Sequence, residues 1–133
     1  MLQKITVALS TLFLAATVIL GARWTCGWMG GEELAGMDFN PESRMVGVVI
    51  TSLQRGADPN VEFNGQVALD NAAEQECFEV VAVLLKYGAR PQLMSGHHAR
   101  LCLQPKNWAK IERKLMSLGA DPVRYRKLLE ERG

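Results

Sequence analysis

The sequence lacks an excess of charge of either sign. Its 133 residues include 15 basic and 14 acidic side chains, so the formal net charge is +1. A generally basic chain that holds nucleic acid by its phosphates and an acidic disordered tail both need a large charge excess. Both classes are therefore excluded. The length leaves room for one small domain with an accessory segment.

The chain also lacks the motifs that carry catalysis. It has no serine in a Gly-x-Ser-x-Gly turn, no glycine-rich phosphate loop, no pair of catalytic carboxylates and no cysteine–histidine pairing. Its two histidines, His97 and His98, are adjacent, and neither a third histidine nor a nearby carboxylate in the sequence completes a zinc site. We expect no enzyme activity, no cofactor, no metal site and no small-molecule substrate.

One long apolar run is present at the N-terminus. Lys4 precedes 18 uncharged residues, 5–22, which end in a small Gly-Ala pair. A charged start, an apolar run and a small-residue exit are typical of an export signal, whereas this length and the following Trp24 and Trp28 are typical of a membrane anchor. Residues 1–22 are therefore expected to be a signal peptide or an N-terminal hydrophobic helix that anchors the chain. Either way, we expect a periplasmic or inner-membrane-anchored protein with its domain outside the cytoplasm.

Opposite charges divide the rest of the chain. Residues 24–85 hold 2 basic and 10 acidic side chains, a net −8, and residues 86–133 hold 11 basic and 4 acidic, a net +7. The acidic part is expected to attract a protein partner with a basic surface. The basic part either meets anionic lipid headgroups or an acidic partner, or is an ordinary solvated helix face. The cations concerned are Lys106, Lys110, Arg113, Lys114, Arg124, Arg126 and Lys127.

A pattern recurs three times after the apolar run. The segments VVITSLQRGADPN, VVAVLLKYGARPQ and IERKLMSLGADPV share Gly-Ala-x-Pro, with the glycines at Gly56, Gly88 and Gly119, 32 and 31 residues apart. In each segment a helix is expected to end at the glycine, which adopts the left-handed conformation readily, and the proline prevents the helix from continuing. This spacing predicts a helical repeat protein.

The middle unit, residues 64–91, resembles an ankyrin repeat. The family pattern runs Gly-x-Thr-Pro-Leu-His-x-Ala-Ala, a short turn, Glu-Val-Val-x-Leu-Leu-Leu and Gly-Ala-Asp. In place of Thr-Pro-Leu-His, residues 67–70 read Val-Ala-Leu-Asp, so the hydroxyl and imidazole hydrogen bonds that brace neighbouring repeats are expected to be missing here. The matching positions are Gly65, Leu69, Ala72, Ala73, Glu79, Val80, Val81, Leu84, Leu85, Gly88 and Ala89.

The resemblance implies an all-α, ankyrin-like helical solenoid of about three repeats with a C-terminal capping helix. Residues 23–38 are expected to form a linker or N-terminal cap, and residues 39–133 the repeat domain, with a poor first helix in its first unit. Asp121 is expected to be the N-cap of the capping helix. The helices expected outside the middle unit cover residues 44–53, 99–103, 107–118 and 123–132.

Ankyrin repeats bind other proteins through hairpin tips and first helices, without chemistry. Carried over by position, this places Phe63 at the tip of the first hairpin, where it either anchors a partner or packs on its own repeat. Because adjacent repeats stack, Cys77 and Cys102 either form a disulfide or remain buried free thiols. The expected partner-binding residues are Asn60, Glu62, Phe63, Asn64, Gln66, Asp70, Asn71, Gln92, Met94 and His97.

These observations lead to two functional hypotheses. The first is a non-catalytic interaction module that binds and inhibits one specific protein outside the cytoplasm, such as an immunity-type protein acting on a toxin or enzyme. The alternative is a membrane-tethered scaffold, in which an uncleaved N-terminal segment (residues 5–22) holds a complex at the bilayer.

Overall fold

The computed structural model describes residues 30–133. The signal or anchor predicted for residues 1–22 lies outside this range, as do Trp24, Cys26 and Trp28. The described part is all-helical, with seven α-helices, one 3₁₀ turn and no strand, and none of these helices is long and apolar enough to cross a bilayer. The elements are α2 (Gly31–Gly36), α3 (Glu42–Gln54), α4 (Ala68–Glu74), α5 (Phe78–Lys86), η1 (Pro91–Leu93), α6 (Gly96–Leu103), α7 (Pro105–Ser117) and α8 (Pro122–Arg132).

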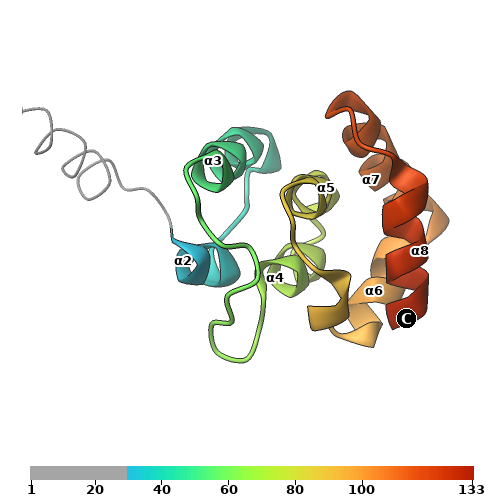
Figure 1. Ribbon diagram of the computed structural model, residues 1–133, viewed down its shortest axis with the longest axis horizontal. Coiled ribbons are helices and arrows are strands. Elements are labelled where there is room, and N and C mark those ends of the chain that lie inside the picture. Colours follow the sequence, from blue (N-terminus) through green and yellow to red (C-terminus); the bar gives the residue numbers. More distant parts are fainter. Residues whose placement is uncertain (1–29) are drawn as a thin grey trace, which may run out of the picture.

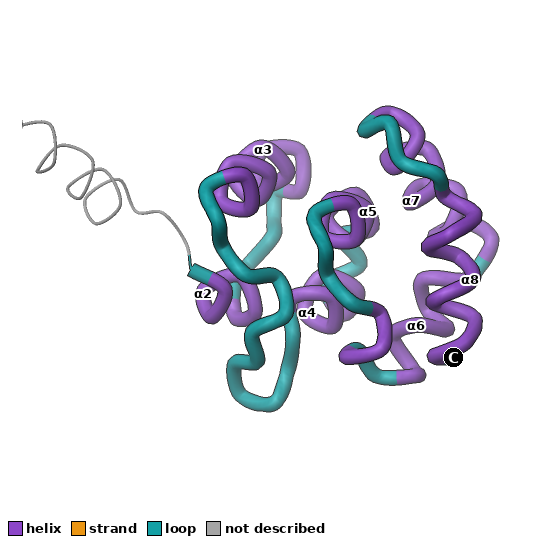
Figure 2. The backbone as a smooth tube through the Cα atoms, in the orientation of Figure 1, coloured by secondary structure: helices purple, strands orange, loops and turns teal. Residues whose placement is uncertain are grey.

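The helices form pairs that stack in one direction (Figures 1 and 2). One row consists of α3, α5 and α7, in which each helix contacts the next. The other row consists of α2, α4 and α6, and the contacts of α4 with α5 and of α6 with α7 join the two rows. The last helix, α8, packs on α6, η1 and α7 and ends the stack at the side opposite α2.

The three recurring glycines end α3, α5 and α7 in the same way. Gly56, Gly88 and Gly119 have φ values of 99°, 99° and 75°, which glycine adopts without the steric cost that a Cβ would bring. The residue after each glycine donates its N–H to the carbonyl five residues earlier, so an otherwise orphaned carbonyl is satisfied. These bonds join Ala57 to Ser52, Ala89 to Leu84 and Ala120 to Leu115. The helix ends predicted from the repeated motif are confirmed.

The centre of the core is α5. Its residues from Val80 to Leu85 are each at most 2% exposed, because α3, α4 and α7 all contact this helix. A helix that is apolar on every side is stable only where neighbours cover it all round. Deleting one of these side chains, as in Leu84→Ala, is expected to cost about 2–5 kcal/mol of stability.

The first helix pair begins earlier than the sequence indicated. α2 lies inside the stretch expected to be a linker or cap, and its Leu34 is fully buried. In the turn that leads to α3, Phe39 is also fully buried, and its N–H donates to Gln75 Oε1 over 2.8 Å. A helix of six residues is too short to show a periodic signal or to be stable alone, so its contact with α4 holds it in place.

The C-terminal helices α7 and α8 begin close to the residues at which the sequence predicts their starts. Pro105 is the first residue of α7 and separates this helix from α6. A proline is tolerated at the first position of a helix because the N–H that it lacks would have no hydrogen-bond partner in the helix. Asp121 caps α8 by accepting a hydrogen bond from the Val123 N–H over 3.1 Å. Leu129 of α8 is fully buried, so this helix covers the last layer of the core. The helix predicted at residues 123–132 is confirmed and starts one residue earlier.

Candidate partner-binding surface

A tight hairpin projects between the first and second helix pairs. Phe63 and Gln66 exchange two backbone hydrogen bonds, of 2.9 and 3.1 Å, across the residues Asn64 and Gly65. Both central residues have positive φ, 54° at Asn64 and 77° at Gly65. An Asn-Gly pair favours this backbone, which is that of a type I′ turn. The turn therefore holds Phe63 at a defined position near the tip.

The Phe63 ring lies against α2 and remains 44% exposed. A Cβ on Gly36 would lie only 2.8 Å from the ring atom Cδ1, so the absence of a side chain at residue 36 lets the ring approach the helix. The ring therefore packs within its own chain, and its exposed part leaves the anchoring of a partner as a prediction. Beside the ring is a groove of about 480 Å³, which we call the Phe63 groove, lined by Glu32, Glu33, Gly36, Met37, Asp38 and Phe63.

The Phe63 groove combines apolar surface with negative charge. Phe63 and Met37 supply the apolar part, and the three carboxylates come from α2 and the turn that follows it. Among the other predicted contact residues, Glu62 and Asn64 are exposed next to Phe63, and Gln92 and His97 are exposed on η1 and on α6. The structure therefore leaves five of the predicted residues free to meet a partner, three of them consecutive at the hairpin tip.

Asp70, one of the predicted partner contacts, is buried and is not a surface residue. It lies on α4 with 6% exposure. Its Oδ1 accepts from the Ser95 N–H over 2.8 Å and lies 2.8 Å from Nδ1 of His98, which is also 2.9 Å from Ser95 Oγ. Because a carboxylate only accepts, the Nδ1 atom carries the proton in this pair. The cluster braces α4 against α6 through the hydroxyl of Ser95 and the imidazole of His98, whereas the absence of such groups was predicted only for residues 67–70.

The Asp70 cluster differs in geometry from a nucleophile–base relay. In such a relay one imidazole nitrogen faces the hydroxyl and the other faces the carboxylate. Here Ser95 Oγ and Asp70 Oδ1 both lie within hydrogen-bond distance of the same nitrogen of His98, Nδ1. The arrangement therefore holds two helices together and does not activate the serine.

Two more of the predicted contacts, Asn71 and Met94, are also buried. Asn71 on α4 is 8% exposed, and its Nδ2 donates to the carbonyl of Met37 over 2.8 Å, which ties α4 to the end of α2. Gln75 strengthens this connection by donating to the same carbonyl over 2.7 Å. Met94, just after η1, is fully buried in the core. The family pattern placed these residues near the binding face but did not show which side of each element they occupy.

Asn60 and Gln66 use their amides within the chain. Asn60 donates from Nδ2 to the Gly88 carbonyl over 3.1 Å and accepts from the Arg90 N–H over 2.8 Å, so it joins the loops that follow α3 and α5. Gln66 donates from Nε2 to Glu74 Oε2 over 2.7 Å. Both amides position the hairpin relative to the helices, and neither is free at the tip.

Cys77 and Cys102 are buried free thiols, so the disulfide alternative is corrected by the structure. The Cys77 sulfur faces the first unit, 3.7 Å from the Phe39 carbonyl oxygen, rather than α6, which carries Cys102. Burial raises the pKa of the Cys77 thiol to about 11, and the Glu42 carboxylate adds to this increase. Burial raises the pKa of Cys102 to about 12, with a contribution from Asp70. Both thiols are therefore neutral near pH 7 and unreactive as nucleophiles.

Comparisons with known proteins identify no relative of this chain. No protein-family model, no curated protein and no solved structure matches the chain. Within residues 30–133, no three histidine, cysteine, aspartate or glutamate side chains gather in a way that could hold a metal ion.

No sequence pattern indicated the acidic side of the Phe63 groove. Glu32, Glu33 and Asp38 lie in the stretch expected to be a linker or cap, so no surface was built from them. The signal that could have found them is Gly36, since the Phe63 ring occupies the space that a side chain at this position would need. That signal has meaning only once the hairpin is known to fold back onto α2.

Proposed function

We propose that this chain is a small ankyrin-type interaction module. Three helix pairs that end at equivalent glycines, and a hairpin that projects between the first two pairs, support this proposal. The bracing pair Ser95 and His98 also supports it, because these residues begin α6 with the hydroxyl and imidazole of the family's Thr-Pro-Leu-His. The hydrogen bonds that unit two lacks are thus supplied by unit three, with Asp70 as their acceptor on α4.

We further propose that the module binds and inhibits one specific protein outside the cytoplasm, through a basic and apolar segment of that protein. The observation that carries this proposal is the half-exposed Phe63 ring beside three carboxylates in one groove. An aromatic side chain held rigidly at a turn loses little entropy on binding and is the kind of residue that dominates interface energies. The surrounding carboxylates attract a basic segment and mainly accelerate its association.

Affinity capture tests this proposal. The C-terminally tagged full-length chain is recovered from its native cells, and mass spectrometry identifies the eluted proteins and the mass of the chain itself. We expect one protein at equal stoichiometry.

The complex of the chain with this protein should lose about 2 kcal/mol of binding free energy, roughly thirtyfold in Kd, when Phe63 is changed by Phe63→Ala. The acidic substitutions Glu32→Gln and Glu33→Gln should mainly slow association and reduce its salt dependence.

The matched control is Val48→Ala. Val48 is 38% exposed on α3, so this variant removes a similar exposed apolar side chain away from the groove. An equal loss of binding for both variants, or no loss for Phe63→Ala, would mean that the groove is not the contact surface. Capture of several membrane proteins with a chain of uncleaved mass would instead support the scaffold alternative.

A further inference from the structure

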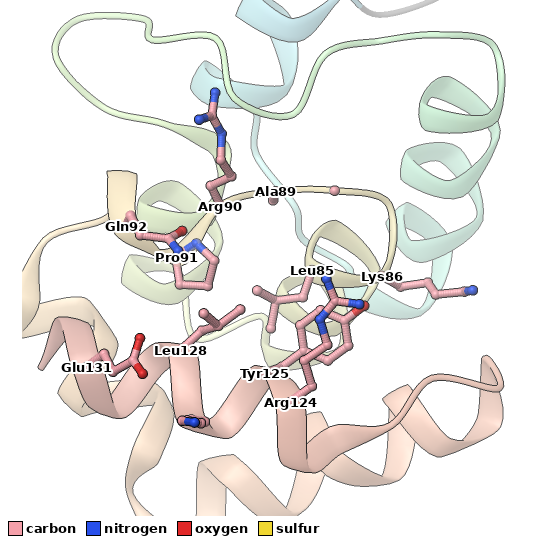
Figure 3. Close-up of a pocket in the computed structure, with 12 residues that line it drawn as sticks. Leu85, Lys86, Ala89, Arg90, Pro91, Gln92, Arg124, Tyr125, Leu128 and Glu131 are labelled. Atoms are coloured by element: carbon pink, nitrogen blue, oxygen red, sulfur yellow. The ribbon is translucent and has the colours of Figure 1, made fainter.

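A second groove lies at the other end of the stack, between α8 and the chain that leads from α5 into η1 (Figure 3). We call it the C-terminal groove; its volume is about 570 Å³. Leu85, Pro91, Tyr125 and Leu128 contribute its apolar lining, and in Figure 3 Leu85, Pro91 and Leu128 converge from the two sides. This volume lies in the range of sites that accept small ligands and single anchoring side chains.

Positive charge surrounds the C-terminal groove. Lys86, Arg90, Arg124 and Lys127 all border it and are all exposed, whereas Glu131 is its single acidic residue. The ion pairs of His98 with Asp70 and of Arg126 with Glu130, both within residues 30–133, involve none of these four cations. Arg124 lies over the Tyr125 ring at 5.8 Å, which leaves its guanidinium free to donate.

These two properties distinguish the groove from the rest of the basic C-terminal part. Outside the groove, Arg126 of α8 pairs with Glu130 and lies over the Trp108 ring of α7 at 5.6 Å, so this cation already has partners within the chain. On the groove side, four cations outside these ion pairs surround a concave apolar surface. A flat lipid headgroup layer does not fill a concave site, whereas a peptide can place an apolar side chain in it and carboxylates at its edge.

We propose that the C-terminal groove is a second binding site, which takes an acidic peptide segment of another protein with an apolar side chain as its anchor. The site is independent of the Phe63 groove, since the two are lined by different residues and border α2 and α8, at opposite ends of the stack. The module then has two docking sites of opposite charge and can join a basic segment to an acidic one.

The test measures binding of a fluorescein-labelled peptide of three Glu-Glu-Leu repeats to the full-length chain, kept throughout in a non-ionic detergent. Fluorescence anisotropy reports the affinity. We expect this peptide to bind, and its Gln-Gln-Leu and Glu-Glu-Gly counterparts to bind at least about tenfold more weakly, because one lacks the charge and the other the anchor. Raising the salt concentration should weaken the acidic peptide further.

Charge reversal locates the site. Arg124→Glu with Lys127→Glu changes two exposed residues of the C-terminal groove, and Lys106→Glu with Arg113→Glu makes the same net change on exposed residues of α7 outside it. We expect a loss of about tenfold or more for the groove variant and less than about threefold for the α7 variant. Circular dichroism checks that both variants remain helical. Equal losses would assign the binding to net charge and overturn the proposal, as would no binding of the acidic peptide.

Two further outcomes would assign the groove to another occupant and would also overturn the proposal. Displacement of the peptide by phosphatidylserine added to the micelles, but not by phosphatidylcholine, would identify a lipid headgroup site. Self-association of the chain that the groove variant abolishes would identify the acidic half of a second copy. Phe63→Ala is expected to leave peptide binding unchanged, so failure of this site is distinguishable from failure of the proposed function.

Discussion

Glu42, the first residue of α3, has a carboxylate oxygen with no hydrogen-bond partner. Its Oε2 is buried from solvent. Burial raises the pKa of this carboxyl above its usual 4.5, and the Glu79 carboxylate raises it further. In the pH range between the unfolded value and this raised value, the folded protein holds a proton that the unfolded chain has lost. Stability from this group therefore falls as the pH rises through that range, and the ionised carboxylate remains a cost at neutral pH.

Glu42→Gln is expected to raise the midpoint of thermal unfolding at pH 7. Glutamine keeps the shape of the side chain and removes the buried charge and its repulsion from Glu79. The difference from the wild-type midpoint should shrink as the pH is lowered toward 4, where both side chains are neutral in the folded state. Circular dichroism melts at a series of pH values measure this difference. A gap that stays constant with pH would contradict the predicted titration.

Asp70 is expected to contribute to stability through its contacts with α6. Asp70→Ala removes the acceptor of the Ser95 N–H and leaves His98 without its partner, so we expect a loss of about 1–3 kcal/mol in the free energy of unfolding. Asp70→Asn retains an oxygen that can accept from Ser95 and should cost less. Urea unfolding measures both, with the exposed Glu62→Ala as the control, for which a change within about 0.5 kcal/mol is expected. A loss for Glu62→Ala as large as that for Asp70→Ala would contradict this assignment.

At the scale of helices, the short first helices depend for their stability on hydrogen bonds with neighbouring helices. α2 has six residues and α4 seven, and neither would be stable in isolation. Each is held by a neighbour through side chains that donate to a backbone carbonyl or accept from a backbone N–H. Asn71 and Gln75 hold α2 against α4, and Asp70 holds α4 against α6. The polar residues of the first helices thus position the units, while the second helices bury more apolar side chains than the first helices do.

Two glycine substitutions test the role of backbone conformation in these helices. Gly88 ends α5 at a φ of 99°, so Gly88→Ala is expected to destabilise the protein by about 1 kcal/mol or more, although a Cβ there meets no other atom within 4 Å. Gly47 lies inside α3 and also has open space around a Cβ, so Gly47→Ala should stabilise by about 0.5–1 kcal/mol. Chemical denaturation of both variants measures the sign of each change in the free energy of unfolding. The same sign for both would mean that conformation at Gly88 is not decisive.

At the scale of the whole molecule, the stack is short and has charged ends of opposite sign. The Phe63 groove borders α2 and the C-terminal groove borders α8, and the core between them is centred on α5. Because each unit buries its apolar face only against its neighbours, opening of one unit exposes the next. Buried groups in different units should therefore become accessible together.

Thiol labelling tests this cooperativity and the absence of a disulfide. Cys77 and Cys102 are buried in different units, and their pKa values, raised to about 11 and about 12, keep both thiols neutral at pH 8. In the native protein, iodoacetamide should modify both very slowly and at similar rates, and in urea both should react fully. Mass spectrometry of the peptides that contain them gives the two rates. Rapid labelling of either thiol, or failure to label both in urea without a reductant, would contradict the structure.

Much of the helical layout could be predicted from the sequence, and much less of the surface. The Gly-Ala-x-Pro motifs located three helix ends because that backbone turn depends on local chemistry. Asp121 and Pro122 located the start of α8 for the same reason. α2 was missed because a six-residue helix has no period to detect. Asp70, Asn71 and Met94 were assigned to the surface because a motif position names a residue's place along a helix but not the neighbour that covers it.

The sequence by itself determined the all-helical class, the points where α3, α5 and α7 end, and the division of charge, since each depends on residues close together in the chain. Only the tertiary structure decided which polar residues brace the units, that Cys77 and Cys102 stay apart, and that Phe63 lies beside carboxylates some 25 to 31 residues earlier in the chain. These features depend on which side chains meet when helices stack. Such contacts follow from packing between distant segments, and no local pattern encodes them.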